Sequence, residues 1–126
     1  MKGILLFGHG ARNPDWAAPF HRIRELILAG NPDALIGMGF LELMRPTFDE
    51  GIDGLIQRGA TEITIVPIFM AAGSHIKKDL PTMAGAMMDR HPGISVGIAA
   101  PVGEAELVLQ AMADYALSVE VELLGQ

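Results

Sequence analysis

Short, continuously apolar runs alternate four times with segments whose apolar residues recur at helical spacing. The apolar runs cover residues 4–7, 35–41, 63–70 and 94–98. Runs of this length are typical of strands that are buried on both faces of a parallel sheet. Strands that alternate with helices in this way are joined by right-handed crossovers. The pattern therefore predicts an α/β fold with a four-stranded parallel sheet.

Four amphipathic helices are expected after the four runs. The first three helices are expected to end at Gly30, Gly59 and His91. The third is expected to start near Asp79 and the fourth near Glu104. The residues expected to face inward are Phe20, Ile23 and Ile27; Phe48, Ile52, Leu55 and Ile56; Leu80, Met83, Met87 and Met88; and Val108, Ala111, Met112 and Tyr115. Residues 118–126 fit either a helix extension or a short tail.

Size and composition narrow the class of protein. A length of 126 residues predicts one domain over residues 1–126, and 50% hydrophobic residues predict a packed core. The lack of cysteine excludes a disulfide framework and thiolate zinc sites. A net charge of −6 argues against nucleic-acid binding, and no apolar run is long enough to span a membrane. We expect a soluble cytoplasmic protein.

Three side chains that can bind a metal or a proton follow three different apolar runs. His9 follows the first run, Glu42 the second and His75 the third. Because ligands bind at the carboxyl ends of parallel strands, we expect these side chains at one edge of the sheet. Imidazole and carboxylate together suit cobalt, iron, nickel or zinc. The alternatives are histidines bonded locally in their loops and a Glu42 paired with Arg45 or Arg12.

Several common catalytic motifs are missing from the chain. The sequence contains neither an HExxH zinc motif nor a GxSxG nucleophile elbow. It also lacks a P-loop and a GxGxxG dinucleotide fingerprint. Hydrolase and dehydrogenase functions therefore have little support.

An ordered set of short motifs resembles one known family over almost the whole chain. These motifs are GHGARNP near the start, FLE after the second run, VPIF in the third, and GSHIKKDLP after it. Together they resemble the small, single-domain sirohydrochlorin chelatases of cobalamin and siroheme synthesis, within the class II tetrapyrrole chelatases. The resemblance implies a flavodoxin-like, three-layer α/β/α fold, and it implies that short members pair as homodimers.

The resemblance also implies a reaction, a lyase-class insertion of a divalent metal into sirohydrochlorin or a related tetrapyrrole without ATP. The metal, cobalt, iron or nickel, is then a substrate, and no organic cofactor is expected. The histidines of the family's metal site correspond to His9 and His75, and its acidic residue to Glu42. We expect these three residues to be catalytic, as metal ligands or proton acceptors.

Further residues in the same loops are expected to bind the tetrapyrrole. Basic groups would pair with its carboxylates, and methionines would line an apolar wall. The expected substrate-binding residues are Arg12, Arg45, Ser74, Lys77, Met44 and Met70. The chain departs from the family pattern at Ala11, where serine is common, and at Ser74, where a second glycine is common.

Two other functions remain open from the sequence. One is a non-catalytic metal or tetrapyrrole carrier with the same fold. The other is a general α/β interaction domain whose histidines have no special role.

The length favours the homodimer, because one small domain cannot enclose a large macrocycle.

Overall fold

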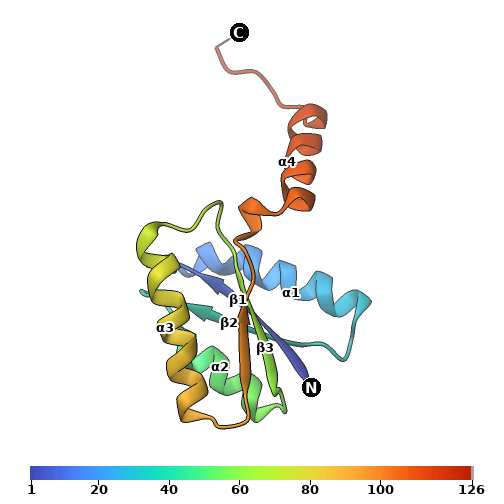
Figure 1. The fold of residues 1–126 in the computed structure, drawn as a ribbon. Coiled ribbons are helices and arrows are strands. Elements are labelled where there is room, and N and C mark those ends of the chain that lie inside the picture. The colour runs from blue at the N-terminus through green and yellow to red at the C-terminus, as the bar shows by residue number, and fades with distance from the viewer. Residues whose placement is uncertain (126) are drawn as a thin grey trace.

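The computed structural model describes residues 1–125, which form a four-stranded parallel sheet with strand order β2-β1-β3-β4 (Figure 1). The strands are β1 (Lys2–Gly8), β2 (Leu35–Phe40), β3 (Glu62–Pro67) and β4 (Ser95–Ile98). The helices are α1 (Ala18–Gly30), α2 (Phe48–Gln57), α3 (Ser74–Arg90) and α4 (Glu106–Ser118), with short 3-10 turns η1 (Pro14–Ala17) and η2 (Val102–Glu104). This strand order is that of flavodoxin-like folds, so the predicted architecture is confirmed.

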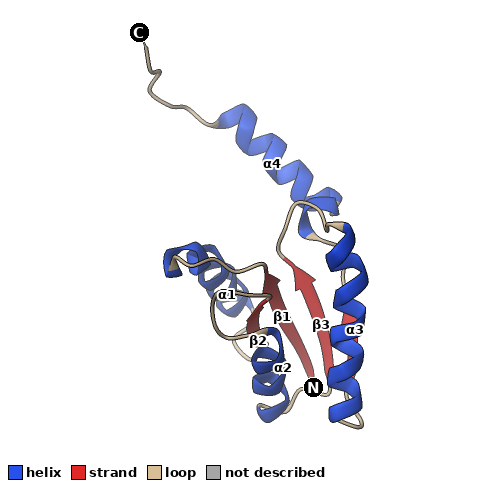
Figure 2. Cartoon of the chain, turned by 90° about the vertical axis from the view of Figure 1, so that its left-hand side faces the viewer, coloured by secondary structure: helices blue, strands red, loops and turns tan. Residues whose placement is uncertain are grey.

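Helices cover the sheet on both faces (Figure 2). In β1, Leu5 and Phe7 are fully buried against α2 and α3, whereas Leu6 points to the other face and packs against Phe20 of α1. Each such large apolar side chain contributes roughly 1.5–3 kcal/mol when it is fully buried. The alternation explains why β1 has few polar residues: both of its faces lie in a core. The expectation of burial on both faces is wrong for β3 and β4, because β3 is exposed at Glu62 and Thr64 and no residue of β4 is buried.

The helix α3 begins earlier than the sequence pattern predicts. The expected start was near Asp79, but α3 begins at Ser74. Gly73 precedes its first turn and accepts a hydrogen bond from the backbone N–H of Lys77 at 3.1 Å. Ile76 is 8% exposed and lies one turn before the buried Leu80, so it extends the apolar stripe of α3 toward the N-terminus. His75 therefore lies in the first turn of a helix rather than in a loop.

The predicted packing of the last helix is wrong. α4 forms where a helix was expected, but no residue within it is buried, and Met112 and Tyr115 are 42% and 68% exposed. Figures 1 and 2 show α4 projecting away from the sheet. Residues 119–125 continue from it without helix or strand, so the tail is the alternative that the structure supports.

A search of the described residues for a helix long and apolar enough to cross a membrane finds none.

Candidate functional site

The loops after β1 and β2 are joined at the carboxyl edge of the sheet. The backbone N–H of Leu41 donates to the carbonyl of Gly8 at 2.9 Å, and that of Glu42 donates to the carbonyl of His9 at 3.1 Å. Gly10, with a φ angle of 93°, lies so close that a Cβ atom there would collide with the carbonyl oxygen of Glu42. The structure thus brings His9 and Glu42 together, as the strand-edge argument predicts.

The imidazole of His9 rests on an aromatic ring that the sequence reasoning missed. The ring centroids of His9 and Phe69 are 4.8 Å apart, with an interplanar angle of 41°. Phe69 in turn packs edge-on against Phe7 of β1, with centroids 6.0 Å apart. Phe69 belongs to the VPIF motif, and its position directly after β3 was the available signal. The exposed His9 ring is therefore held on one side by a ring that is anchored to the core.

His75 is the second histidine at this edge of the sheet. It is exposed in the first turn of α3, which follows β3, the neighbour of β1. Ile76, the next residue, lines the same cavity as Phe69, the ring that contacts His9. Within residues 1–125, no group of three or more His, Cys, Asp or Glu side chains is close enough to hold a metal. One copy of the chain thus offers two imidazoles on this edge and no complete ligand cage.

The carboxylate of Glu42 is more exposed than the sequence suggests. We expected partial desolvation behind the apolar run, but Glu42 is exposed, and within residues 1–125 it forms no ion pair. Neither Arg45 nor Arg12 is its partner. β2 ends at Phe40, and residues 41–43, which follow it, are all exposed.

Arg45 pairs with Glu50 and not with Glu42. Its guanidinium donates two hydrogen bonds to Glu50, one of them from Nε at 3.1 Å. Glu50 also forms a capping box with Thr47 at the start of α2. The hydrogen bond from Arg45 and that from the Thr47 backbone lower the pKa of Glu50 to about 2, and the same hydrogen bond raises the pKa of Arg45. To bind a substrate carboxylate, Arg45 would have to share or leave Glu50.

The remaining predicted substrate contacts divide into exposed and packed residues. Arg12, Ser74 and Lys77 are exposed in or beside the strand-end loops, and Met70 is 58% exposed. Met44 is half-buried and packs against the core on the α1 side of the sheet.

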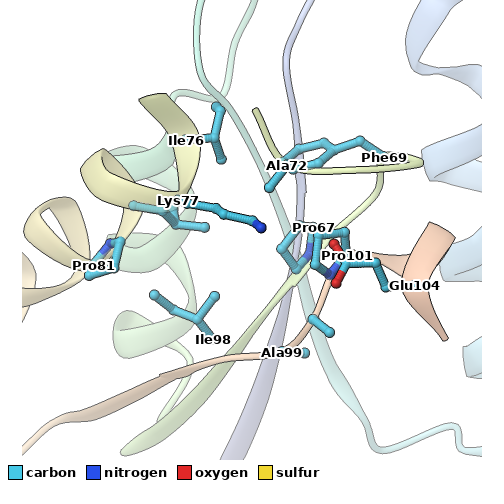
Figure 3. Close-up of a pocket in the computed structure, with 12 residues that line it drawn as sticks. Pro67, Phe69, Ala72, Ile76, Lys77, Pro81, Ile98, Ala99, Pro101 and Glu104 are labelled. Atoms are coloured by element: carbon cyan, nitrogen blue, oxygen red, sulfur yellow. The ribbon is translucent and has the colours of Figure 1, made fainter. Parts of the chain in front are cut away.

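An apolar cavity of about 240 Å³ opens beside Phe69 (Figure 3). It is lined by residues from β3, α3, the end of β4 and the segment after it, among them Pro67, Ile76, Ile98 and Pro101. In Figure 3 the side chain of Lys77 extends across the cavity toward Pro67, and the carboxylate of Glu104 lies beside Pro101. The cavity combines apolar walls with one cation, Lys77, and one anion, Glu104, an arrangement suited to a largely apolar ligand with a few polar groups.

Comparison with known proteins finds relatives that match most of the chain. The CbiX family model matches residues 3–118. A sirohydrochlorin cobaltochelatase of Saccharolobus solfataricus is 34% identical over 109 residues, which cover 82% of this chain and 84% of that one. Another, from Methanosarcina acetivorans, is 39% identical over 79 residues, covering 63% of this chain and 61% of that one.

Solved structures also align with most of this chain. A CbiX protein from Marinobacter aquaeolei, described as a protein of cobalamin (vitamin B12) biosynthesis, aligns with a TM-score of 0.79 and 28% identity over 93% of this chain and 95% of that one. The sirohydrochlorin chelatase SirB of Bacillus subtilis, in complex with cobalt, aligns with a TM-score of 0.77 and 28% identity. The alignment covers 94% of this chain but 50% of SirB.

The fold and these relatives define a protein of the tetrapyrrole chelatase class, as the sequence motifs predicted. The chain belongs to the CbiX family.

Proposed function

We propose that this protein is an enzyme that inserts a divalent metal into sirohydrochlorin. The observation that carries the proposal is the position of His9 and His75 at one edge of a CbiX-family sheet, beside an apolar cavity. The curated relatives are named sirohydrochlorin cobaltochelatases, and SirB structures contain cobalt or Fe3+. Cobalt is therefore the first candidate metal, with iron and nickel next. The product would serve cobalamin or siroheme synthesis in the cytoplasm.

Metal insertion makes two chemical demands. The metal ion must exchange water for the pyrrole nitrogens, and two pyrrole N–H protons must leave. Imidazole meets both demands, because its neutral form binds borderline metals and accepts protons near neutral pH. In our proposal, His9 and His75 hold the incoming ion or accept the protons, and Glu42 assists from the adjoining loop.

The surroundings of the histidines suit the macrocycle. Phe69 and the apolar cavity offer a surface for its ring system, and exposed Met70 extends that surface. Arg12, Lys77 and Ser74 lie where carboxylate side chains of the tetrapyrrole could reach them. Arg45 contributes only if the substrate competes with Glu50.

A second copy completes the site in this proposal. One chain supplies two imidazoles at the carboxyl edge, and it aligns with half of SirB. In a twofold dimer, each edge residue occurs twice around a shared cleft. Two chains would then surround the macrocycle with four imidazoles.

Histidine variants test the proposed chemistry. We expect His9→Ala and His75→Ala each to lower the initial rate of cobalt insertion by roughly 10²-fold or more, since a positioned acid–base group contributes about 10²–10⁴-fold. The rate is followed by the shift of the sirohydrochlorin absorption spectrum on addition of cobalt.

His91→Ala is the matched control, because His91 caps the opposite end of α3 from His75 and bonds to Asp53 at 2.9 Å. This variant should keep the wild-type rate. Wild-type rates in both His9→Ala and His75→Ala would contradict the assigned roles. Circular dichroism of each variant separates loss of chemistry from loss of fold.

A further inference from the structure

The imidazole of His9 is held by an aromatic contact and not by hydrogen bonds. Glycines flank it on both sides, so neither neighbour in the chain supplies a side chain against the ring. Among residues 1–125, no hydrogen bond reaches this imidazole, whereas the ring of His91 bonds to Asp53 at 2.9 Å. The ring of Phe69, 4.8 Å away between centroids, is therefore the contact that can fix the orientation of His9.

The side chain of Phe69 is itself anchored in the core. Its ring packs edge-on against Phe7, with centroids 6.0 Å apart and an interplanar angle of 69°, and Phe7 is fully buried. Aromatic pairs of this geometry contribute about 0.5–1.5 kcal/mol beyond the area that they bury. Phe69 is half-buried, so its ring meets the core and also meets His9. The ring is thus a fixed support for the imidazole.

The backbone at Phe69 is held from two sides. On one side, the N–H of Ile68 donates to the carbonyl of Phe7 at 2.8 Å, which continues the pairing of β1 with β3 past Pro67. On the other side, the N–H of Gly103 in η2 donates to the carbonyl of Phe69 at 3.1 Å. The segment after β4 therefore helps to hold the residue that supports His9.

Gly103 can approach this segment because it has no side chain. A Cβ atom at Gly103 would collide with the carbonyl oxygen and the Cα atom of Met70, which follows Phe69 directly. Backbone atoms cannot rotate away as the end of a side chain can. Any larger residue at this position would therefore force η2 and the Phe69–Met70 segment apart.

We infer that Phe69 and Gly103 are positioning residues that fix the orientation of the His9 imidazole for metal insertion. A histidine side chain without such support is spread over about three χ1 wells and two χ2 orientations. Packing on Phe69 selects among these orientations before the substrate arrives, and Gly103 acts by holding Phe69. The effect on rate rests on the proposed metal insertion, but the orientation of His9 does not.

NMR of the histidine rings tests the orientation without metal or tetrapyrrole. An aromatic ring displaces the proton signals of a group packed against it, and within residues 1–125 His9 is the one histidine with such a contact. The His9 ring signals, assigned by their loss in His9→Gln, should be displaced from those of the exposed His75. The displacement should vanish in Phe69→Leu, which keeps an apolar side chain, and remain in Phe69→Tyr, which keeps the ring. An unchanged displacement in Phe69→Leu would overturn the inference.

Phe48→Leu is the matched control for the loss of an aromatic ring. Phe48 packs edge-on against the same Phe7, with centroids 5.7 Å apart, and is 2% exposed. Because it is more buried than Phe69, its replacement should lower the free energy of unfolding at least as much, measured by urea denaturation. The His9 signals should nevertheless stay displaced. Equal loss of the displacement in both variants would show that His9 responds to any loosening of the core, and would contradict a specific role of Phe69.

Steady-state kinetics of cobalt insertion separate positioning from binding, since Phe69 also offers an apolar surface to the macrocycle. Phe69→Leu should lower kcat roughly three- to tenfold, because the imidazole is then spread over about six orientations. The KM for sirohydrochlorin should change less than kcat, and Phe69→Tyr should recover most of kcat. A raised KM with an unchanged kcat would show loss of binding alone, and would contradict the positioning role.

Gly103→Ala tests the more distant positioning residue. It should reduce both the displacement of the His9 signals and kcat, in the same direction as Phe69→Leu. Gly97→Ala is its control, because a Cβ atom at Gly97 in β4 meets nothing within 4 Å, and it should change neither. Wild-type signals and kcat in Gly103→Ala would contradict the role of Gly103. A wild-type protein without insertion activity would contradict the proposed function, and the NMR signals would still decide whether Phe69 orients His9.

Discussion

Gly10 shows how one residue holds the proposed site together. It has a positive φ angle of 93°, and its lack of a side chain lets the His9 loop lie against Glu42. An L-residue in this backbone region costs about 1–3 kcal/mol, and here a Cβ atom would also strike the Glu42 carbonyl. The glycine is thus required by both the backbone angle and the close approach.

We therefore expect Gly10→Ala to lower the free energy of unfolding by roughly 2 kcal/mol or more, measured by urea denaturation. It should also slow metal insertion, because the loops of His9 and Glu42 must separate. Gly30→Ala is the control: Gly30 ends α1, has an ordinary φ angle and meets nothing within 4 Å. The free energy of unfolding of Gly30→Ala should equal that of the wild type or be slightly higher. If Gly10→Ala were as stable as Gly30→Ala, the two loops would not be packed as described.

At the same scale, the sequence located some site residues and missed others. His9 and Glu42 could be found because parallel strands bring their carboxyl ends to one edge. The contact of Phe69 with His9 could not be found, since it depends on side-chain directions after β3. The pairing of Arg45 with Glu50 was missed for a similar reason: it depends on the shape of the loop between β2 and α2.

At the scale of elements, the start of α2 depends on Glu50. Its carboxylate accepts hydrogen bonds from Arg45 and from the Thr47 backbone, which hold its pKa at about 2 instead of 4.5. Because the folded-state pKa is lowered, ionised Glu50 stabilises the fold above about pH 4.5. This stabilisation is lost as the pH falls toward 2. Since the pair is solvent-exposed, screening keeps its contribution modest.

Glu50→Gln should accordingly have a lower Tm than the wild type at pH 7, and the difference should shrink between pH 4.5 and pH 2. Thermal unfolding followed by circular dichroism over this range measures it. Arg45→Met, which removes the partner, should show the same convergence. A Tm difference that stayed constant down to pH 2 would contradict the role assigned to the Arg45–Glu50 pair.

The two helices that differ from expectation do so for identifiable reasons. α3 starts early because Ile76 continues its apolar stripe, a signal that the sequence contains but that the glycine loop before it obscured. α4 forms where a helix was predicted, but none of its residues is buried. Amphipathic spacing predicts that a helix has an apolar side, and it does not show what that side contacts.

At the scale of the whole molecule, the charge of −6 opposes a substrate rich in carboxylates. The repulsion is screened beyond about 8 Å at physiological ionic strength, so charges close to the substrate matter most. Arg12 and Lys77 are exposed near the carboxyl edge, whereas Arg90 pairs with Asp49 at the other end of α3. The fold class and this edge could be read from the sequence. The length also predicted that one domain would not enclose the macrocycle, and the structure adds that residues 1–125 hold no complete set of metal ligands.

Repeated turnover distinguishes a metal chelatase from a metal or tetrapyrrole carrier. The direct test adds cobalt and excess sirohydrochlorin to a small amount of protein and follows the absorption spectrum. We predict insertion faster than the protein-free control, with many equivalents of metallated product formed per chain. A spectral change that stops at one equivalent or less per chain would identify a carrier, and a rate equal to the control would contradict catalysis altogether.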